Sequence, residues 1–216
     1  MTQETKQTLI SALFAIGCLL LYFFYPVGDS RFEIFVATLI FLCGLPLLYN
    51  KIVLHRTVRD MGLESFLMEK KDILLLASAV VLGGLISFFL VAMNFGIQRY
   101  IGSLSLTIVK NFGAFAIYEL VFSLLAMLLF SFFAWGFVRS IAWHKEIYAY
   151  FFSLCVFGVL LMDFYSGFFI IVPLIIPALF LLKMDKKINF LYIFIACYSI
   201  GLILDTIIVK SFASIL

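Results

Sequence analysis

Continuous apolar runs of membrane-spanning length recur along the sequence, and they constrain the fold more than any other feature. The first runs cover residues 9–27, 32–50, 73–94 and 112–138. A helix needs about 20 predominantly apolar residues to cross a bilayer. A membrane β-barrel would instead alternate apolar and polar residues, and these runs do not. The sequence therefore predicts an all-α, polytopic membrane protein.

Composition supports the same fold class and limits the partners. Of the 216 residues, 65% are hydrophobic and 12% are charged, whereas soluble domains average about 25% charged residues. The length predicts a single transmembrane domain over residues 1–216, with about seven spans and a range of six to eight. A net charge of +3, placed in loops, does not indicate a nucleic-acid partner.

The later spans and the orientation follow from the polar interruptions. The run 147–182 is too long for one crossing, and Asp163 with Ser166-Gly167 divides it into spans at 147–162 and 165–182. The last span covers 189–208. With the N-terminus in the cytoplasm, the positive-inside rule separates the basic residues into an inside group and an outside group. The inside group is Lys6, Lys51, Arg56, Arg59, Lys70, Lys71, Arg139, Lys145, Lys183, Lys186 and Lys187, and the outside group is Arg31, Arg99, Lys110 and Lys210.

Three carboxylates lie within or beside the predicted spans: Glu119, Asp163 and Asp205. An ionisable group at membrane depth is costly and is a candidate functional residue. All three fall toward the outer ends of their spans, so they could form an outward-facing site for a cation or a proton. The alternative is that they lie at the headgroup boundary and pair with Lys110 and Lys210.

Catalytic and metal-binding patterns are weak. Both histidines, His55 and His144, fall in predicted cytoplasmic loops, and no predicted helix carries one. A zinc site needs about three protein ligands, so we predict no metal and no cofactor. The glycine-rich nucleotide motifs are also missing from the sequence. All four cysteines lie in apolar runs, where a free thiol behaves as a small hydrophobe: Cys18, Cys43, Cys155 and Cys197.

Two segments carry a resemblance to a known family. The loop 56–63 has the sequence RTVRDMGL, which is basic and ends in Gly-Leu, and the segment 130–138 reads FSFFAWGFV. They resemble the basic loop and the E-E-x-x-x-R-G-x-L segment of the CPBP family, which includes CAAX-type prenyl endopeptidases and Abi bacteriocin-immunity proteins. The resemblance extends from about residue 32 onward and implies a multi-pass protein of the bacterial inner (plasma) membrane.

The catalytic residues of that family are replaced in this chain. Phe130 and Ser131 stand in place of two glutamates, and Trp135 stands in place of the arginine. The family's F-x-x-x-H motif would begin at Phe157, but Leu161 stands in place of its histidine. The last predicted span has no histidine either. The resemblance implies that catalytic members activate water with Glu and His groups and a metal. Phe, Trp and Leu cannot accept a proton.

The motif-like remnant consists of Ser131, Trp135, Gly136 and Arg139. A second alignment places residues 118–123 on the motif and retains only Glu119. An interfacial Trp135 and a basic Arg139 also fit the cytoplasmic end of an ordinary span. Glu119 is about 24 Å from Trp135 at 1.5 Å per helical residue, so these groups are not expected to form one active site.

These observations favour a pseudoenzyme: a non-catalytic, CPBP-like binding, scaffold or accessory subunit of a membrane complex. Its partners would be the lipid bilayer and a lipid, a peptide or another membrane protein. One alternative is a small transporter or channel component that uses Glu119, Asp163 and Asp205. Another is a divergent CAAX-type intramembrane protease, in which Glu119 and a hydroxyl group supply the chemistry.

Overall fold

The computed structural model describes residues 3–25, 31–57, 61, 70–93, 111–141, 146–162, 173–174 and 190–213. All regular structure in these residues is helical, which confirms the all-α fold class for this part of the chain. Five of the helices found there are long and apolar enough to cross a membrane. They are Thr5–Phe24, Phe35–Ile52, Ile73–Leu90, Gly113–Val138 and Phe190–Ile207.

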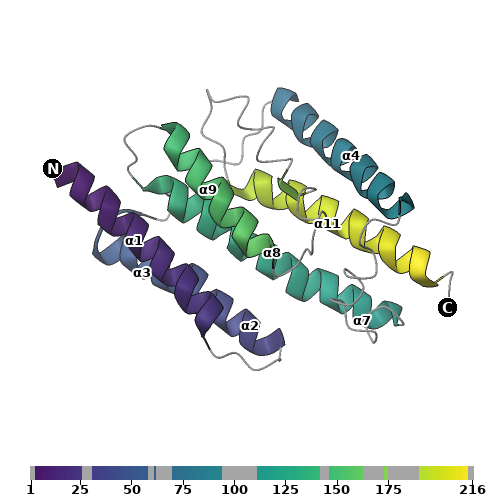
Figure 1. The fold of residues 1–216 in the computed structure, drawn as a ribbon, viewed down its shortest axis with the longest axis horizontal. Helices are drawn as coiled ribbons and strands as arrows, with labels where there is room; N and C mark the ends of the chain where they lie inside the picture. The colour runs from purple at the N-terminus through teal and green to yellow at the C-terminus, as the bar shows by residue number, and fades with distance from the viewer. Residues whose placement is uncertain are drawn as a thin grey trace. The chain divides into compact units, whose positions relative to one another are not determined.

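Two of these spans, Phe35–Ile52 and Gly113–Val138, are built from consecutive α- and π-helical segments, and Figure 1 labels the α-helices. The π-helix forms i→i+5 hydrogen bonds and is rare, yet three segments within the described residues adopt it. In chain order the elements are α1 (Gln3–Phe24), α2 (Arg31–Ala37), η1 (Thr38–Gly44), α3 (Leu45–Ile52), α4 (Lys70–Ala92), α7 (Phe112–Ile117), η3 (Tyr118–Ser123), α8 (Leu124–Ser131), η4 (Phe132–Val138), α9 (Glu146–Leu161) and α11 (Phe190–Ala213).

The predicted spans correspond to these helices to different degrees. Five of the seven coincide with helices of spanning length. The predicted span at 147–162 coincides with α9, which has 16 residues and is shorter than the others. The predicted span at 165–182 lies outside the described residues, apart from 173–174. The count of seven spans and the cytoplasmic N-terminus therefore stay predictions.

Contacts divide the chain into two compact units, which we describe separately. Unit 1 comprises Met1–Phe66, Leu128–Phe157 and Lys187–Leu191. Unit 2 comprises Leu67–Met127, Gly158–Lys186 and Tyr192–Leu216. The prediction of a single domain stays a prediction.

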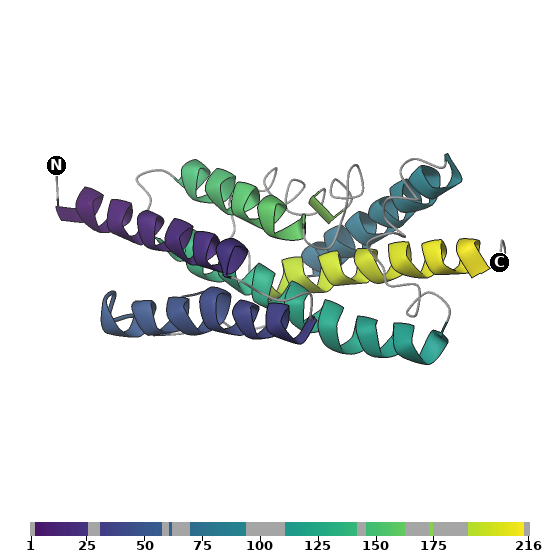
Figure 2. The same cartoon turned by 60° about the horizontal axis from the view of Figure 1, so that its bottom comes forward.

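Unit 1 is held together by aromatic side chains. The helix α1 lies beside the run α2–η1–α3 in both views (Figures 1 and 2). Phe14 stacks on Tyr49 with ring centroids 4.1 Å apart, and Phe137 of η4 meets both rings edge-on at 6.0 and 6.1 Å. Such edge-to-face contacts add to the gain from burying the rings. Every residue of η4 is buried.

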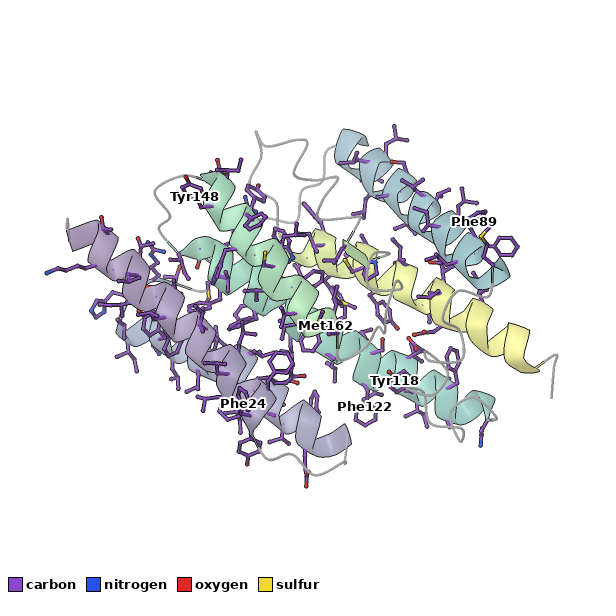
Figure 3. The ribbon with its side chains drawn as sticks, in the orientation of Figure 1. Phe24, Phe89, Tyr118, Phe122, Tyr148 and Met162 are labelled. Atoms are coloured by element: carbon purple, nitrogen blue, oxygen red, sulfur yellow. The ribbon has the colours of Figure 1, made fainter. Side chains whose placement is uncertain are left out.

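Small residues allow two helices of unit 2 to pack closely. Ala79, Gly83 and Ser87 form a buried stripe of small residues on α4. A Cβ placed on Gly83 would lie 2.9 Å from Cγ1 of Ile200, so this glycine allows α4 to approach α11 closely. The two helices lie side by side in Figures 1 and 2. In Figure 3, Phe89 points away from α11, as a lipid-facing residue would.

Candidate functional site

Unit 2 brings together two of the three carboxylates that the sequence singled out. Glu119 of η3 and Asp205 of α11 have only 1% and 4% of their surface exposed. The side chains of Asp205 and Ser123 face the Glu119 carboxyl group. We call Glu119 and Asp205 the acidic pair. Asp163, the third predicted member, lies outside the described residues.

A backbone contact fixes the two elements that carry the acidic pair. The hydroxyl group of Tyr198 on α11 donates a hydrogen bond of 3.1 Å to the backbone carbonyl of Glu119. Asp205 lies seven residues after Tyr198, which is two helical turns along the same face of α11. The backbone N–H of Leu124 also bonds to the Glu119 carbonyl, as the π-helical geometry of η3 requires.

The carboxyl group of Glu119 lies in a buried environment. Neither of its oxygens has a hydrogen-bond partner in the described part of the chain. Burying an ionised carboxylate without partners is expensive, and a second carboxylate beside it adds repulsion. Lys110 and the side chain of Lys210, the predicted partners, lie outside the part that the structure describes. The arrangement of the acidic pair can hold a positive charge: a proton or a small cation.

The motif-like remnant lies in unit 1, in a tightly packed core. Ser131 and Trp135 have 0% and 2% of their surface exposed. The centroid of the Trp135 ring lies 6.2 Å from the ring centroid of Tyr150 and 6.3 Å from that of Phe157, and both of these residues belong to α9. Ser131 Oγ, Trp135 Nε1 and Ser153 Oγ are buried without hydrogen bonds among the described residues. This core is aromatic, with isolated polar atoms.

Arg139, at the end of the remnant, takes part in a defined polar contact. Its Nη2 atom donates a 2.8 Å hydrogen bond to the hydroxyl group of Tyr150. The guanidinium carbon also lies 4.5 Å from the centroid of the Tyr150 ring, and Nη2 lies 4.0 Å from Glu146 Oε1. Burial lowers the pKa of Arg139, while Tyr150 and Glu146 act in the opposite direction. An arginine nevertheless remains charged in proteins.

The two segments that carry the family resemblance contact each other in unit 1. A Cβ on Gly136 would lie 3.1 Å from the backbone carbonyl oxygen of Met61. Arg56 Nη1 donates a 2.6 Å hydrogen bond to the backbone carbonyl of Ser140. The Gly62-Leu63 end of the loop lies outside the described residues. The glycine at position 136 therefore lets the loop backbone approach the helix.

The sequence did not reveal three neighbours of these candidate residues. Ser123 and Tyr198 lie beside the acidic pair, and Tyr150 contacts Trp135 and Arg139 of the motif-like remnant. A hydroxyl-bearing residue in a membrane helix is common, so nothing in the sequence distinguished these three. Tyr150 and Phe157 are seven residues apart, so the sequence places them on one face of a helix. That spacing does not show which residue of another helix they contact.

Metal binding has no support in the described residues, where no group of three His, Cys, Asp or Glu residues could hold an ion. Comparisons of the chain with models of protein families, with curated proteins and with solved structures find no match.

Proposed function

We propose that this chain is a non-catalytic, CPBP-like membrane protein that acts as a binding or accessory subunit of a complex in the bacterial inner membrane. The observation that carries the proposal is the packing of Trp135 against Phe157. These residues stand at the motif positions of an arginine and of the phenylalanine in F-x-x-x-H. The resemblance implies an arginine at position 135, beside the two glutamates of the motif, and the buried ring of Trp135 occupies that position.

Hydrolysis requires a water molecule and a group that can take its proton. Phe130, Ser131 and Trp135 are buried in unit 1, and none of them is a general base at neutral pH. The unpartnered hydroxyl group of Ser131 has no histidine beside it among the described residues to activate it. The packing of this core supports an architectural role.

The contact between loop and helix also supports a retained architecture. Gly136 lies against the carbonyl of Met61, and Arg56 bonds to the backbone of Ser140.

Large apolar side chains remain exposed on α1 and α4, including Leu13, Phe24, Leu85 and Phe88. Within a bilayer these faces can meet lipid or the helix of another membrane protein.

Purification in mild detergent tests the subunit proposal. The tagged chain should recover a stoichiometric membrane-protein partner that an unrelated tagged membrane protein does not recover. The same preparation should not cleave a prenylated CAAX peptide, with or without added Zn²⁺. A chain that purifies alone and cleaves the peptide would overturn the proposal and support the divergent protease instead.

A second function, cation transport, is favoured by the acidic pair. The carboxyl group of Glu119 is buried, unpartnered in the described residues and faces Asp205. Reconstituted vesicles would show proton or monovalent-cation flux if the pair carries ions. Glu119→Gln and Asp205→Asn should then abolish the flux, whereas Glu146→Gln, which removes a carboxylate with 60% of its side chain exposed, should not. Equal flux in all variants and in empty vesicles would exclude this function.

A further inference from the structure

The acidic pair presents a charge problem that the subunit proposal does not explain. Glu119 is 1% exposed and Asp205 is 4% exposed, and they belong to helices of spanning length. Both carboxyl oxygens of Glu119 lack hydrogen-bond donors in the described residues. The Tyr198 hydroxyl group, which is close, already donates to the Glu119 backbone. An ionised Glu119 would therefore be poorly solvated by these residues and would be repelled by an ionised Asp205.

The groups around the pair favour a proton over a metal ion as the source of the compensating charge. Among the described residues, the titratable groups of α11 that face Glu119 are Asp205 and Tyr198, and the neighbouring polar group of η3 is the hydroxyl of Ser123. Divalent cations such as Ca²⁺ require six to eight oxygen ligands, more than these side chains supply. A proton needs only two oxygens. Two carboxyl groups in contact are a known way to retain one proton.

We propose that Glu119 and Asp205 form a proton-binding site inside the helices of unit 2, in which the two carboxyl groups share one proton. Binding forms one O–H bond and cancels one negative charge, and no other reactant is needed. The site does not depend on whether the chain is an accessory subunit or a transporter.

Loss of the proton would have a structural consequence at the contact between η3 and α11. The pair would then carry two negative charges next to the hydrogen bond from Tyr198 to the Glu119 backbone. Repulsion between the charges would weaken this contact. Glu119 itself lies in η3, which has the rare π-helical geometry. The proton therefore stabilises the packing of η3 on α11.

A hydrophobic carbodiimide tests this site, because it forms a covalent adduct with a protonated carboxyl group within a membrane. An ordinary glutamate is protonated in only about one molecule in 500 at pH 7. We expect one adduct per chain at neutral pH, on Glu119 or Asp205, identified by peptide mass spectrometry. The exposed Glu146 is the internal control and should stay unmodified. The Glu119→Gln/Asp205→Asn double variant should show no adduct in this region.

Single variants distinguish a shared proton from burial alone. In Asp205→Asn the amide group can donate to an ionised Glu119, so modification of Glu119 should fall about tenfold or more, equivalent to one pH unit. Unchanged modification of Glu119 in this variant would overturn the shared proton. A folded wild-type chain that is unmodified at neutral pH, but is modified after unfolding in acid, would overturn the site itself.

Added salt tests the alternative occupant. At constant pH, excess Na⁺ or Li⁺ should leave the modification unchanged, with choline chloride as the control for ionic strength. Protection by Na⁺ or Li⁺ alone would show that a metal cation competes for the carboxylates and would overturn the proton as the resident ligand. The adduct on the wild-type chain and its response to salt test the site and its occupant without any substitution, and Asp205→Asn tests the sharing of the proton.

Discussion

Buried hydroxyl groups in unit 1 differ in whether they have a partner, and this difference predicts opposite effects on stability. Ser11 Oγ lies 3.1 Å from the Tyr49 hydroxyl group, whereas Ser131 Oγ has no partner among the described residues. Removing one partner of a buried hydrogen bond costs about 1–3 kcal/mol, and removing an unsatisfied group costs little. Ser11→Ala should therefore lower the thermal unfolding midpoint, and Ser131→Ala should leave it unchanged or raise it.

A thiol-reactive fluorescent dye in detergent provides the measurement, because the buried Cys18 and Cys197 become accessible on unfolding. Both serines are almost fully buried, so each variant is the control for the other. A larger loss from Ser131→Ala than from Ser11→Ala would contradict the assignment of Ser131 as unsatisfied.

The pair formed by Arg139 and Tyr150 predicts a measurable coupling. Tyr150→Phe retains the ring below the guanidinium group but removes the acceptor of the 2.8 Å hydrogen bond. Arg139→Lys removes the planar donor that both contacts use. Hydrogen bonds to charged groups contribute about 1.5–3 kcal/mol, so each variant should lower the unfolding midpoint, with the larger loss in Arg139→Lys. In a double-mutant cycle the two losses should not add; strict additivity would exclude the contact.

Residue type indicated candidate positions in the sequence, but it did not reveal their neighbours. Glu119 and Asp205 stood out because charges are rare in apolar helices. That they face each other depends on how η3 packs on α11, and no local pattern records this packing. Trp135 was identified through the family resemblance, while its neighbour Tyr150 carried no signal of its own.

At the scale of elements, the long apolar runs predicted the helices well because a backbone in lipid must satisfy its own hydrogen bonds. The three π-helical segments η1, η3 and η4 were not predicted. They differ from α-helix by a shift of one residue in hydrogen bonding, which leaves no mark on hydropathy. Small residues at four-residue spacing on α4 favour a close helix contact, and Gly83 lies in such a contact, but the sequence did not identify α11 as the partner.

The close contact between α4 and α11 predicts different responses at adjacent glycines. A Cβ on Gly83 would clash with Ile200 Cδ1 and lie 2.9 Å from its Cγ1, whereas a Cβ on Gly84 would lie 3.7 Å from Ile203 Cγ2, an ordinary contact. Overpacking costs about 1–3 kcal/mol, so Gly83→Ala should lower the unfolding midpoint. Gly84→Ala should not, because alanine has the better helix propensity. Shortening the opposing side chain in Gly83→Ala/Ile200→Val should restore part of the loss; no rescue would argue against this packing.

At the scale of the whole molecule, the sequence could not predict which helices belong to each compact unit. Positions that face lipid and positions that face a neighbouring helix are both apolar, because lipid chains are as apolar as leucine. Contacts place α1 with the α2–η1–α3 run in unit 1, and α4 with residues 192–213 of α11 in unit 2. The pairing of α4 with α11 joins segments that are far apart in the chain.

The distribution of basic residues predicts the orientation of the molecule, and cysteine accessibility tests it. In a background without the four native cysteines, Gln7→Cys and Glu146→Cys should be shielded from a membrane-impermeant maleimide in intact cells. Met93→Cys, at the opposite end of a predicted span, should be labelled. All three positions are exposed in the structure, so burial does not account for a difference. Opening the cells should make all three reactive.

Labelling of Gln7→Cys but not Met93→Cys in intact cells would show the opposite orientation. Labelling of Met93→Cys and Glu146→Cys together would contradict the predicted single crossing of the Gly113–Val138 helix, because the two positions would then face the same side.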